Sequence, residues 1–208
     1  MDKFSNKISE TVIRRMPVYH RYLTELIENE VERVSSKELS LITGFSASQI
    51  RQDLNNFGGF GQQGYGYNTK QLKEQVDKIL GIDKTYNTII VGAGRLGSAL
   101  ARYKGFRKSG FKVTSLFDID DSIKDVSGIA VRPMDTIKDY IRDELVEVAI
   151  ITVPKEACKE VADILVDAGI KGIWNFSPYD LKVQGKIAVE NIRLNDSLMT
   201  LSYFMKEL

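Results

Sequence analysis

Side chains suited to catalysis and metal binding are scarce in this sequence. Its 208 residues include one cysteine, Cys158, and one histidine, His20. A single cysteine excludes an internal disulfide framework and is typical of the reducing cytoplasm, where we expect the protein to act. Cys158 keeps helical register with Val161 and Leu165, and His20 lies in another helical pattern, so both are expected to have structural roles. We therefore expect neither a metal site nor a catalytic residue.

Long apolar runs and an excess of positive charge are also missing. No apolar run approaches the roughly 20 residues that a membrane-spanning helix needs, and the N-terminal residues lack the apolar segment of a signal peptide. We expect no membrane partner. The formal net charge is only +1, whereas many DNA-binding domains are strongly basic. Any prediction of DNA binding must therefore depend on local pattern.

The pattern of predicted secondary structure changes near residues 81–84, which we interpret as a linker. Helical periodicities dominate up to residue 80, and short apolar strands alternate with helical patterns from residue 85 to 192. Strands are expected at residues 88–91, 112–117, 129–132, 148–153, 172–176 and 186–192, and helices at 96–106, 134–142 and 155–168. Such alternation predicts an α/β domain in which helices cover a parallel sheet.

Two short helices are expected after a long first helix at residues 9–32. Ser35 with Glu38, and Ser46 with Gln49, have the spacing of capping boxes that begin helices. Gly44 lies between the two segments, and two short helices joined by a glycine-containing turn form a helix-turn-helix. Their core-facing residues are expected to be Leu39, Ile42, Ala47, Ile50, Leu54 and Phe57.

The opposite face of the second helix has amide and guanidinium groups with no carboxylate at its centre. Asn and Gln can pair with adenine, and Arg with guanine, in the major groove of DNA. The alternative is an ordinary solvent-exposed face, although such faces usually mix Lys and Glu. The residues expected to contact DNA from this helix are Ser46, Ser48, Gln49, Arg51, Gln52 and Asn55.

A stretch rich in glycine, glutamine and tyrosine follows at residues 58–67. Glycines permit tight reversals, and the alternating aromatic residues suggest the hairpin wing of a winged helix. Gln62, Gln63, Gly64 and Tyr65 are expected to reach DNA from this wing. An ordinary surface hairpin is the alternative.

The strand expected at residues 88–91 leads into a glycine-rich turn and then a helical pattern. The turn consists of Gly92, Ala93, Gly94, Arg95, Leu96 and Gly97. A GxGxxG turn between a strand and a helix cradles the pyrophosphate of a dinucleotide. Asp118 lies 21 residues after Gly97, at the end of the next strand, where a carboxylate binds the adenosine ribose and would repel a 2′-phosphate. The pattern favours NADH and NAD+, with a coenzyme A site or a ligand-free turn as alternatives.

Two further strand ends could line the nicotinamide side of this site. They are the segment Thr152, Val153 and Pro154 and the segment Asn175, Phe176, Ser177 and Pro178, although loop-forming proline also explains such segments. Hydride transfer needs a positioned acid or base and space for a substrate, and neither is evident. A sensor is therefore favoured over a minimal NAD-dependent oxidoreductase.

The C-terminal segment, residues 195–208, is apolar around most of its helical circumference. A helix of this kind must be buried, either in a second subunit or against its own domain. The first possibility predicts a homodimer formed through this helix.

The chain resembles the Rex family of redox-sensing transcriptional repressors along essentially its full length. The resemblance depends on the segments at residues 49–54, 57–58, 60–61, 64–67, 92–100 and 175–176. It implies a winged helix-turn-helix DNA-binding domain at residues 1–80, a Rossmann NAD(H)-binding domain at 85–192 and a domain-swapped dimerisation helix at 193–208. It also implies a homodimer that represses respiratory and fermentative genes at a palindromic operator and leaves DNA when NADH binds.

The same resemblance places Tyr103 near the nicotinamide and gives Arg15 a part in the switch between domains. The chain departs from the family pattern at Gln52, where lysine is usual, and at Gln62 and Gln63, where basic residues are usual. Fewer phosphate contacts imply weaker DNA binding and a shallower dependence on salt. Arg193 stands where the acidic partner of the switch arginine is expected.

Overall fold

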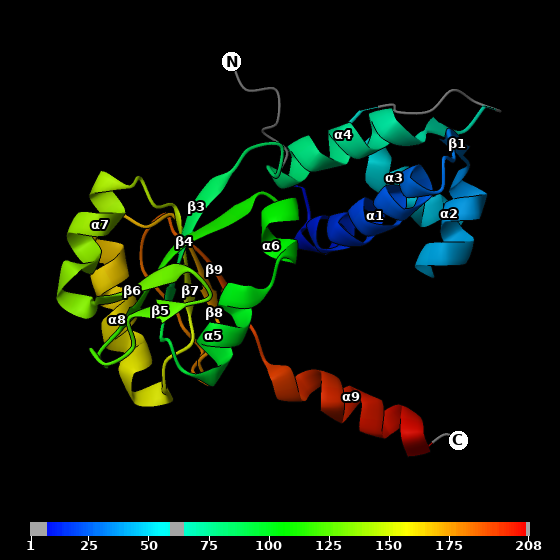
Figure 1. Cartoon of the computed structure of the whole chain (residues 1–208). Coiled ribbons are helices and arrows are strands. Elements are labelled where there is room, and N and C mark those ends of the chain that lie inside the picture. The colour runs from blue at the N-terminus through cyan, green and yellow to red at the C-terminus, as the bar shows by residue number, and fades with distance from the viewer. Residues whose placement is uncertain (1–7, 59–64, 207–208) are drawn as a thin grey trace. The chain divides into compact units, whose positions relative to one another are not determined.

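The computed structural model describes residues 8–58 and 65–206. The chain divides into two compact units, Met1–Lys84 and Thr85–Leu208, and each unit has its own buried apolar core. Figure 1 shows the helices of the first unit and the sheet of the second. The predicted fold class, a helix-turn-helix unit followed by a Rossmann-like unit, is confirmed.

The first unit is helical apart from one short strand pair. Its elements are α1 (Glu10–Glu28), β1 (Arg33–Val34), α2 (Ser36–Thr43), α3 (Ala47–Asn55), β2 (Tyr67–Asn68) and α4 (Thr69–Leu80). β1 and β2 are antiparallel, with Val34 opposite Tyr67. This pair and α4 were not predicted; Asn68 caps α4 by accepting a hydrogen bond from the Gln71 backbone.

The long first helix ends earlier than its pattern predicts. α1 begins after the N-cap Ser9 and ends at Glu28, because Glu30 adopts a left-handed backbone conformation with φ of 60°. Met16, Tyr19 and Leu23 are buried on one face of α1, and they form the centre of the apolar core of this unit.

The two helices of the helix-turn-helix begin where the capping pattern predicts. Ser35 and Glu38 form a complete capping box at the start of α2, and the Ser46 hydroxyl accepts a hydrogen bond from the Gln49 backbone at the start of α3. Gly44 ends α2 with φ of 77°. α3 ends at Asn55, two residues before the predicted position.

The expected core faces of these helices need two corrections. Leu39, Ile50 and Leu54 are buried, but Ile42 is 39% exposed. The short helix α2 contacts the core through Leu39, and Ile42 lies outside that contact. Ala47 is only half-buried, since it occupies the first turn of α3, at the rim of the core.

The second unit is a seven-stranded sheet covered by helices on both faces. Its strands are β3 (Tyr86–Val91), β4 (Phe111–Asp118), β5 (Asp125–Val126), β6 (Ile129–Pro133), β7 (Val148–Ile151), β8 (Gly172–Asn175) and β9 (Ala188–Asn191), in the spatial order β5-β6-β4-β3-β7-β8-β9. All neighbours are parallel except β5, which pairs antiparallel with β6. The six predicted strands are present, and β5 is an addition.

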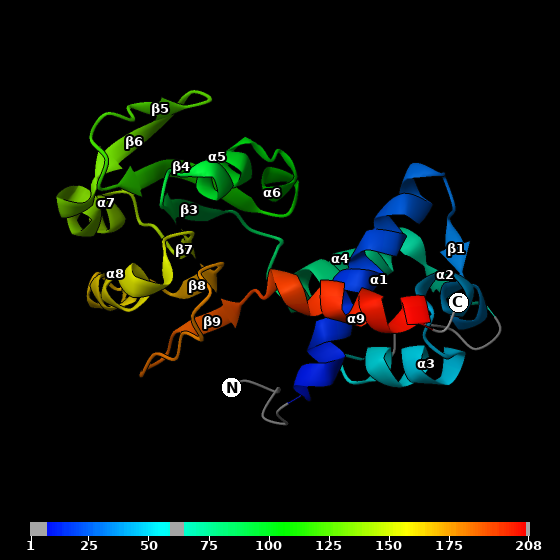
Figure 2. The same ribbon diagram turned by 90° about the horizontal axis from the view of Figure 1, so that it is seen from below.

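Helices follow β3, β6 and β7 along the chain, as Figures 1 and 2 show. They are α5 (Arg95–Arg102), α6 (Gly105–Lys108), a 3₁₀ turn (Met134–Thr136), α7 (Ile137–Asp143) and α8 (Lys155–Asp167). Apolar residues of α7 and α8 pack on one face of the sheet with Ile89, Val91 and Phe117. Residues of α5 and α6 pack on the other face, around Ile90 and Ile150.

The single helix predicted at residues 96–106 is wrong, because the chain forms two helices there. Tyr103 ends α5 in an extended conformation, with ψ of 107°. Its ring packs so closely on Gly105 that a Cβ atom at that position would overlap the ring. The aromatic packing of Tyr103 therefore interrupts a sequence whose periodicity alone favours a continuous helix.

The last described element, α9 (Leu194–Lys206), begins directly after β9 and is red in Figures 1 and 2. None of its residues is buried within the chain. Its exposed apolar residues are Leu194, Leu198, Met199, Leu201, Tyr203, Phe204 and Met205. The helix therefore exposes the apolar surface that its sequence would place inside a core.

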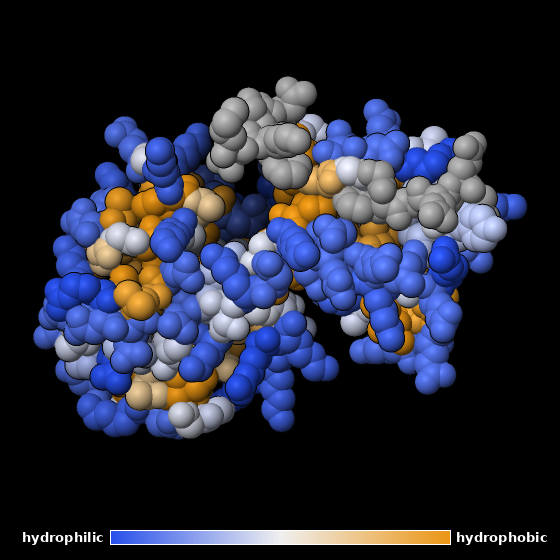
Figure 3. Space-filling model, turned by 90° about the horizontal axis from the view of Figure 1, so that it is seen from above, coloured by the Kyte–Doolittle hydropathy of each residue, from blue (hydrophilic) through white to orange (hydrophobic). Residues whose placement is uncertain are grey.

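The face of the molecule drawn in Figure 3 is largely polar. On the face drawn in Figure 3, hydrophobic residues lie in small groups among hydrophilic ones on both units. Among the described residues, no helix combines the length and the apolar character needed to cross a membrane.

Candidate functional site

The outer face of α3 has the polar side chains that the sequence assigns to DNA contact. Ser46, Ser48, Arg51, Gln52 and Asn55 are exposed, and Gln49 is half-buried. They share this face because Ile50 and Leu54, on the opposite side, are buried in the core. The exposed face therefore offers amide, hydroxyl and guanidinium groups to a partner.

A buried carboxylate attaches α3 to α1. Asp53 is only 2% exposed and accepts two hydrogen bonds of 2.6 Å from Arg15 and one of 2.7 Å from the Tyr19 hydroxyl. The hydrogen bond to Asp53 raises the pKa of Arg15, and burial followed by the same carboxylate raises the pKa of Tyr19. The carboxylate of Asp53 is therefore hydrogen-bonded from two residues of α1 and has a cationic partner beside it.

Asp53 was missed by sequence reasoning, although its position gives a signal. It lies next to Leu54 and one turn after Ile50, on the buried side of α3, where an unpaired carboxylate would be costly. Such a residue requires a cationic partner, and Arg15 supplies it. The partner of Arg15 in this structure thus lies on α3, within the same unit.

The region around the expected wing is described only in part. Gln62, Gln63 and Gly64 lie outside the described residues. Tyr65 is 70% exposed, and Arg33 donates a hydrogen bond of 3.3 Å to its carbonyl oxygen. Arg51 donates a hydrogen bond of 2.9 Å to the Ser36 hydroxyl, so its guanidinium bridges the two helices at the surface.

In the second unit, the glycine-rich turn connects β3 to α5 at the carboxyl edge of the sheet. Gly92 has φ of 102°, and a Cβ atom there would lie 2.7 Å from the Thr152 hydroxyl. A Cβ atom at Gly97 would overlap the Gly92 carbonyl. These two glycines are therefore required by the packing of α5 against β3 and β7.

Gly94 has a different environment. It is the N-cap residue of α5, with φ of −63°, and apart from its two chain neighbours no described residue has an atom within 4 Å of the position that its Cβ would occupy. Nothing in the described part of the chain requires glycine there. The open space at the N-terminus of α5 is where a dinucleotide pyrophosphate approaches in a fold of this type, so the site fits such a group.

Asp118 ends β4 beside this turn. One carboxylate oxygen accepts a hydrogen bond from the Ala93 backbone, and the other accepts one of 2.9 Å from the Asp120 backbone. These bonds point the carboxylate toward the glycine-rich turn, at the position where a ribose would lie. The bond from Asp120 also caps the turn that follows β4.

A cavity of about 490 Å³ lies over this edge of the sheet. Of the predicted cofactor residues, it brings together Gly92, Gly94, Leu96, Asp118, Thr152, Val153, Pro154 and Phe176. Pro178, at the end of the predicted segment that begins at Asn175, also lines it. The predicted residues that do not line it are Ala93, Arg95, Gly97, Tyr103 and Asn175.

Tyr103 lines a second, apolar cavity of about 630 Å³ together with Phe106, Trp174 and Val189. This cavity lies on the α5–α6 face of the sheet and also contacts the amino ends of β3, β7 and β8. Trp174 is in edge-to-face contact with both Phe106 and Phe176. A series of aromatic side chains thus extends from Tyr103 toward the first cavity.

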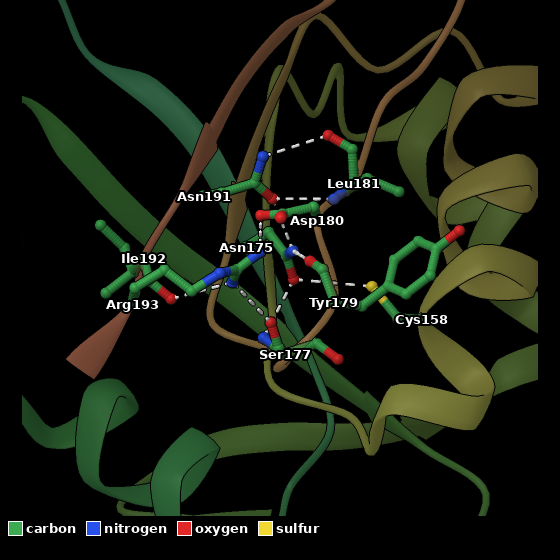
Figure 4. Close-up of polar contacts among 9 residues, drawn as sticks. All are labelled: Cys158, Asn175, Ser177, Tyr179, Asp180, Leu181, Asn191, Ile192 and Arg193. Carbon is green, nitrogen blue, oxygen red and sulfur yellow. Dashed lines mark hydrogen bonds and ion pairs between the residues drawn. The ribbon is translucent and has the colours of Figure 1, made fainter. Parts of the chain in front are cut away.

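Asn175 acts beneath the first cavity instead of lining it. It is fully buried at the end of β8, and its side chain bonds Ser177, Tyr179 and Asn191 (Figure 4). Thr152 lines the cavity and also holds the glycine-rich turn, because its hydroxyl donates to the carbonyl oxygens of Val91 and Gly92. Both residues shape the cavity wall through the backbone.

Cys158 lies on α8 in the second unit, and His20 lies on α1 in the first. Cys158 is fully buried in the core of the second unit, and burial raises the pKa of its thiol. Burial lowers the pKa of His20, which lies 3.4 Å from Asp77. Within the described ranges, no cluster of three or more potential ligands among His, Cys, Asp and Glu occurs.

Two family models match separate parts of the chain. A model described as "Putative DNA-binding protein N-terminus" matches residues 7–55, which include α1, α2 and α3. A model described as "CoA binding domain" matches residues 83–179, which include the glycine-rich turn and Asp118.

Curated relatives match nearly the whole chain. The redox-sensing transcriptional repressor Rex of Clostridioides difficile is 52% identical over 98% of this chain and 98% of its own length. The chain belongs to the Rex family of redox-sensing transcriptional repressors. The Rex protein of Thermoanaerobacter pseudethanolicus is 54% identical over 97% of this chain and 91% of its own length.

Solved Rex-family structures share the fold. The crystal structure of RSP in complex with β-NAD+ and operator DNA has a TM-score of 0.92 and 52% sequence identity, covering 98% of this chain and 94% of RSP. The structure of RSP in complex with β-NADH has a TM-score of 0.89 and 49% identity, covering 98% of this chain and 96% of RSP. The curated Rex relatives are named as transcriptional repressors.

Proposed function

We propose that this Rex-family repressor binds a palindromic operator as a homodimer and releases it when NADH occupies the cavity beside Gly94. The observation that carries the proposal is the open space at Gly94, next to the carboxylate of Asp118, in a chain that also presents an exposed polar α3 face. A relative with 52% identity was crystallised with both NAD+ and operator DNA.

The proposed cofactor residues fall into two groups, those that line the cavity and those that do not. Gly92, Gly94, Leu96 and Asp118 line it and would contact the pyrophosphate and ribose. Thr152, Val153, Pro154 and Phe176 line its other wall and would lie toward the nicotinamide. The turn and the cavity wall would be supported by Ala93, Arg95, Gly97 and Asn175. Tyr103 would influence the site indirectly, through the aromatic side chains that extend from it toward the cavity.

Asp118 favours NAD(H) over a phosphorylated dinucleotide. A carboxylate at the end of this strand accepts hydrogen bonds from the ribose hydroxyls and repels a 2′-phosphate. It also argues against coenzyme A, the alternative favoured by the name of the model that matches residues 83–179, since no paired ribose hydroxyls are available in a 3′-phosphorylated nucleotide.

The proposed DNA-binding domain comprises residues 1–80, with α3 as the recognition helix. Its proposed contacts are Ser46, Ser48, Gln49, Arg51, Gln52 and Asn55, joined by Gln62, Gln63, Gly64 and Tyr65 from the wing. Two such helices in a symmetric dimer read half-sites one helical turn apart, which explains why the operator must be palindromic.

The homodimer is proposed to form through residues 193–208. A row of exposed leucine, methionine and aromatic side chains on α9 needs a partner surface. The apolar cavity beside Tyr103 and Trp174 on the sheet of residues 85–192 leaves a second apolar surface uncovered. A second copy of the chain would remove both apolar surfaces from water. We place the protein in the cytoplasm.

Sensing requires that the two redox states of the cofactor bind differently. NAD+ and NADH differ at the nicotinamide, which is cationic when oxidised, and transfer of a cation to an apolar wall is costly. If NADH favours a closed dimer, it lowers DNA affinity, and DNA lowers NADH affinity by the same factor. A hundredfold effect corresponds to about 2.7 kcal/mol, which is within reach of one buried interaction.

A fluorescence-anisotropy titration tests this proposal. The probe is the operator duplex crystallised with the 52%-identical relative, and a scrambled duplex of equal length is the control. We expect specific binding without nucleotide and with NAD+, and release with NADH. Release by NADH no better than by NAD+ would overturn the proposed direction of sensing.

A second measurement separates the sensor from an oxidoreductase. We propose that the protein is not an enzyme, so NADH mixed with simple ketones and aldehydes should not be consumed. An Asp118→Ala variant should lose NADH affinity in the same assay buffer. Steady turnover, or unchanged NADH binding by the variant, would favour one of the alternatives.

A further inference from the structure

The loop between β8 and β9 connects the wall of the proposed nucleotide cavity to the strand that leads into α9. Phe176 and Pro178, near its start, line the cavity beside the glycine-rich turn. The other end of the loop leads through β9 directly into α9. The same short segment is thus a wall of the proposed nucleotide site and the approach to the proposed dimer helix.

Asn175 fixes the start of this loop. Its side-chain oxygen accepts hydrogen bonds from the Ser177 backbone at 3.0 Å and from the Cys158 thiol at 3.6 Å. Its side-chain nitrogen donates to the Tyr179 carbonyl and to Asn191, both at 2.8 Å. An amide offers two donors and two acceptor positions, so the bonding capacity of this buried group is used in full.

Asn191 fixes the other end of the loop to β9. Its side-chain oxygen accepts from the Leu181 backbone, and its nitrogen donates to the Leu181 carbonyl, both at 3.1 Å. The Ile192 backbone donates to the Asn175 carbonyl at 2.8 Å. These bonds hold β9 up to residue 192 on the sheet, as Figure 4 shows.

Arg193 is the next residue, and it reaches back to the loop. Its guanidinium donates at 3.2 Å to the carbonyl of Ser177, which lies between the two cavity-lining residues Phe176 and Pro178. It also forms an ion pair with Asp180. The following residue, Leu194, begins α9.

The exposure of this ion pair argues against a role in stability alone. The Asp180 side chain is 76% exposed and that of Arg193 is 27% exposed. Ion pairs that are exposed to this extent contribute little to folding stability. What the pair does supply is geometry, because it sets the position of the residue at which the sheet ends and α9 begins.

We propose that Arg193 is a positioning residue that transmits occupancy of the nucleotide cavity to α9. This inference rests on the proposed function. A ligand that displaces Phe176 or Pro178 also displaces the Ser177 carbonyl that Arg193 holds. Because Asn191 keeps β9 in place, the displacement reaches the backbone at Arg193, where the direction of α9 is set.

The test compares coupling in variants that weaken this connection. Coupling is the ratio of operator dissociation constants with and without saturating NADH, measured with the operator duplex of the 52%-identical relative. Asp180→Asn removes the ion pair but leaves the hydrogen bond from Arg193 to the Ser177 carbonyl. Arg193→Gln weakens both the ion pair and that hydrogen bond. Asp167→Asn is the matched control, since Asp167 is 70% exposed and pairs with Lys138 in the same unit.

We expect the coupling ratio to fall by about 2- to 30-fold, the range for residues that modulate coupling without touching either ligand. In Asp180→Asn, NADH affinity, operator affinity without nucleotide and the thermal midpoint should stay close to wild type. The charge-swapped double variant Arg193→Asp/Asp180→Arg should recover part of the lost coupling. Asp167→Asn should leave it unchanged.

Unchanged coupling in Asp180→Asn and Arg193→Gln would overturn the inference, as would equal weakening of operator binding with and without NADH. If Arg193→Gln fails to fold, Asp180→Asn decides the question. An absence of NADH response in the wild-type protein is a different result, because it contradicts the proposed function instead.

Discussion

At the residue scale, the carboxylate of Asp53 determines how the proposed recognition helix is held. It pairs with Arg15, whose side chain is 14% exposed, and accepts the Tyr19 hydroxyl. Asp53→Ala leaves Arg15 as a poorly solvated charge without its partner. We expect the first unit to lose about 3–5 kcal/mol of unfolding free energy, measured by urea unfolding.

Glu10→Gln is the control for this substitution. Arg14, the residue beside Arg15 on α1, pairs with Glu10, and the side chains are 58% and 77% exposed. Exposed pairs of this kind contribute roughly 0–1 kcal/mol. Equal losses in the two variants would contradict the role assigned to the buried carboxylate.

Arg51 is the residue whose side chain should contribute most to operator specificity. A guanidinium can form a bidentate contact with guanine, and its present bond to Ser36 is at the surface. Arg51→Ala should weaken binding to the operator by roughly 1–3 kcal/mol and leave unfolding almost unchanged. An equal loss on scrambled DNA would indicate a phosphate contact.

At the scale of elements, the glycines of the β3–α5 turn should separate folding from binding. Gly94→Ala adds a methyl group to open space at an allowed φ of −63°, so the variant should fold normally. It should bind NADH at least tenfold more weakly, an order-of-magnitude estimate for a group that enters the pyrophosphate site. Isothermal titration calorimetry measures the loss.

Gly97→Ala provides the contrasting outcome. Its Cβ would overlap the Gly92 carbonyl, so α5 must shift from the sheet, and the second unit should lose roughly 1–3 kcal/mol of stability. If Gly94→Ala binds NADH as well as the wild type, the dinucleotide site does not lie at this turn.

The elements that the sequence predicted are those with strong local signals. The parallel strands follow from apolar runs, and α2 follows from its capping box, since both patterns depend on neighbouring residues. The break at Tyr103 was not predictable, because it depends on a ring packing on Gly105. The β1–β2 pair joins residues 33–34 to 67–68, which periodicity does not reveal.

The candidate site shows the same division. The glycine-rich turn and Asp118 have a fixed spacing that the sequence displays directly. The bonds of Asn175 and Arg193 depend on how the 176–181 loop returns over the sheet, and Asp53 depends on a partner 38 residues away. Long-range polar contacts of this kind arise only from the folded arrangement.

At the scale of the whole molecule, α9 should control the oligomeric state. Phe204 is 60% exposed on this helix within the chain, and in the proposed dimer its ring would be buried. Phe204→Asp should convert the dimer to monomer because a carboxylate would enter an apolar contact. Sedimentation equilibrium measures the change, and Lys206→Asp, a polar substitution on the same helix, is the control.

Operator binding should weaken when dimerisation is lost, since a monomer reads one half-site. A Phe204→Asp protein that remains a dimer would contradict the proposed interface. A dimeric wild-type protein that binds DNA only as a monomer would contradict the proposed symmetric arrangement on the operator.

The central claim is that the nucleotide cavity and the DNA-reading helix are thermodynamically linked. The most direct test measures the NADH dissociation constant of the free protein and of its saturated operator complex. Linkage requires NADH to bind the complex more weakly by the same factor by which NADH weakens operator binding. Equal NADH affinity in the two states would contradict the account.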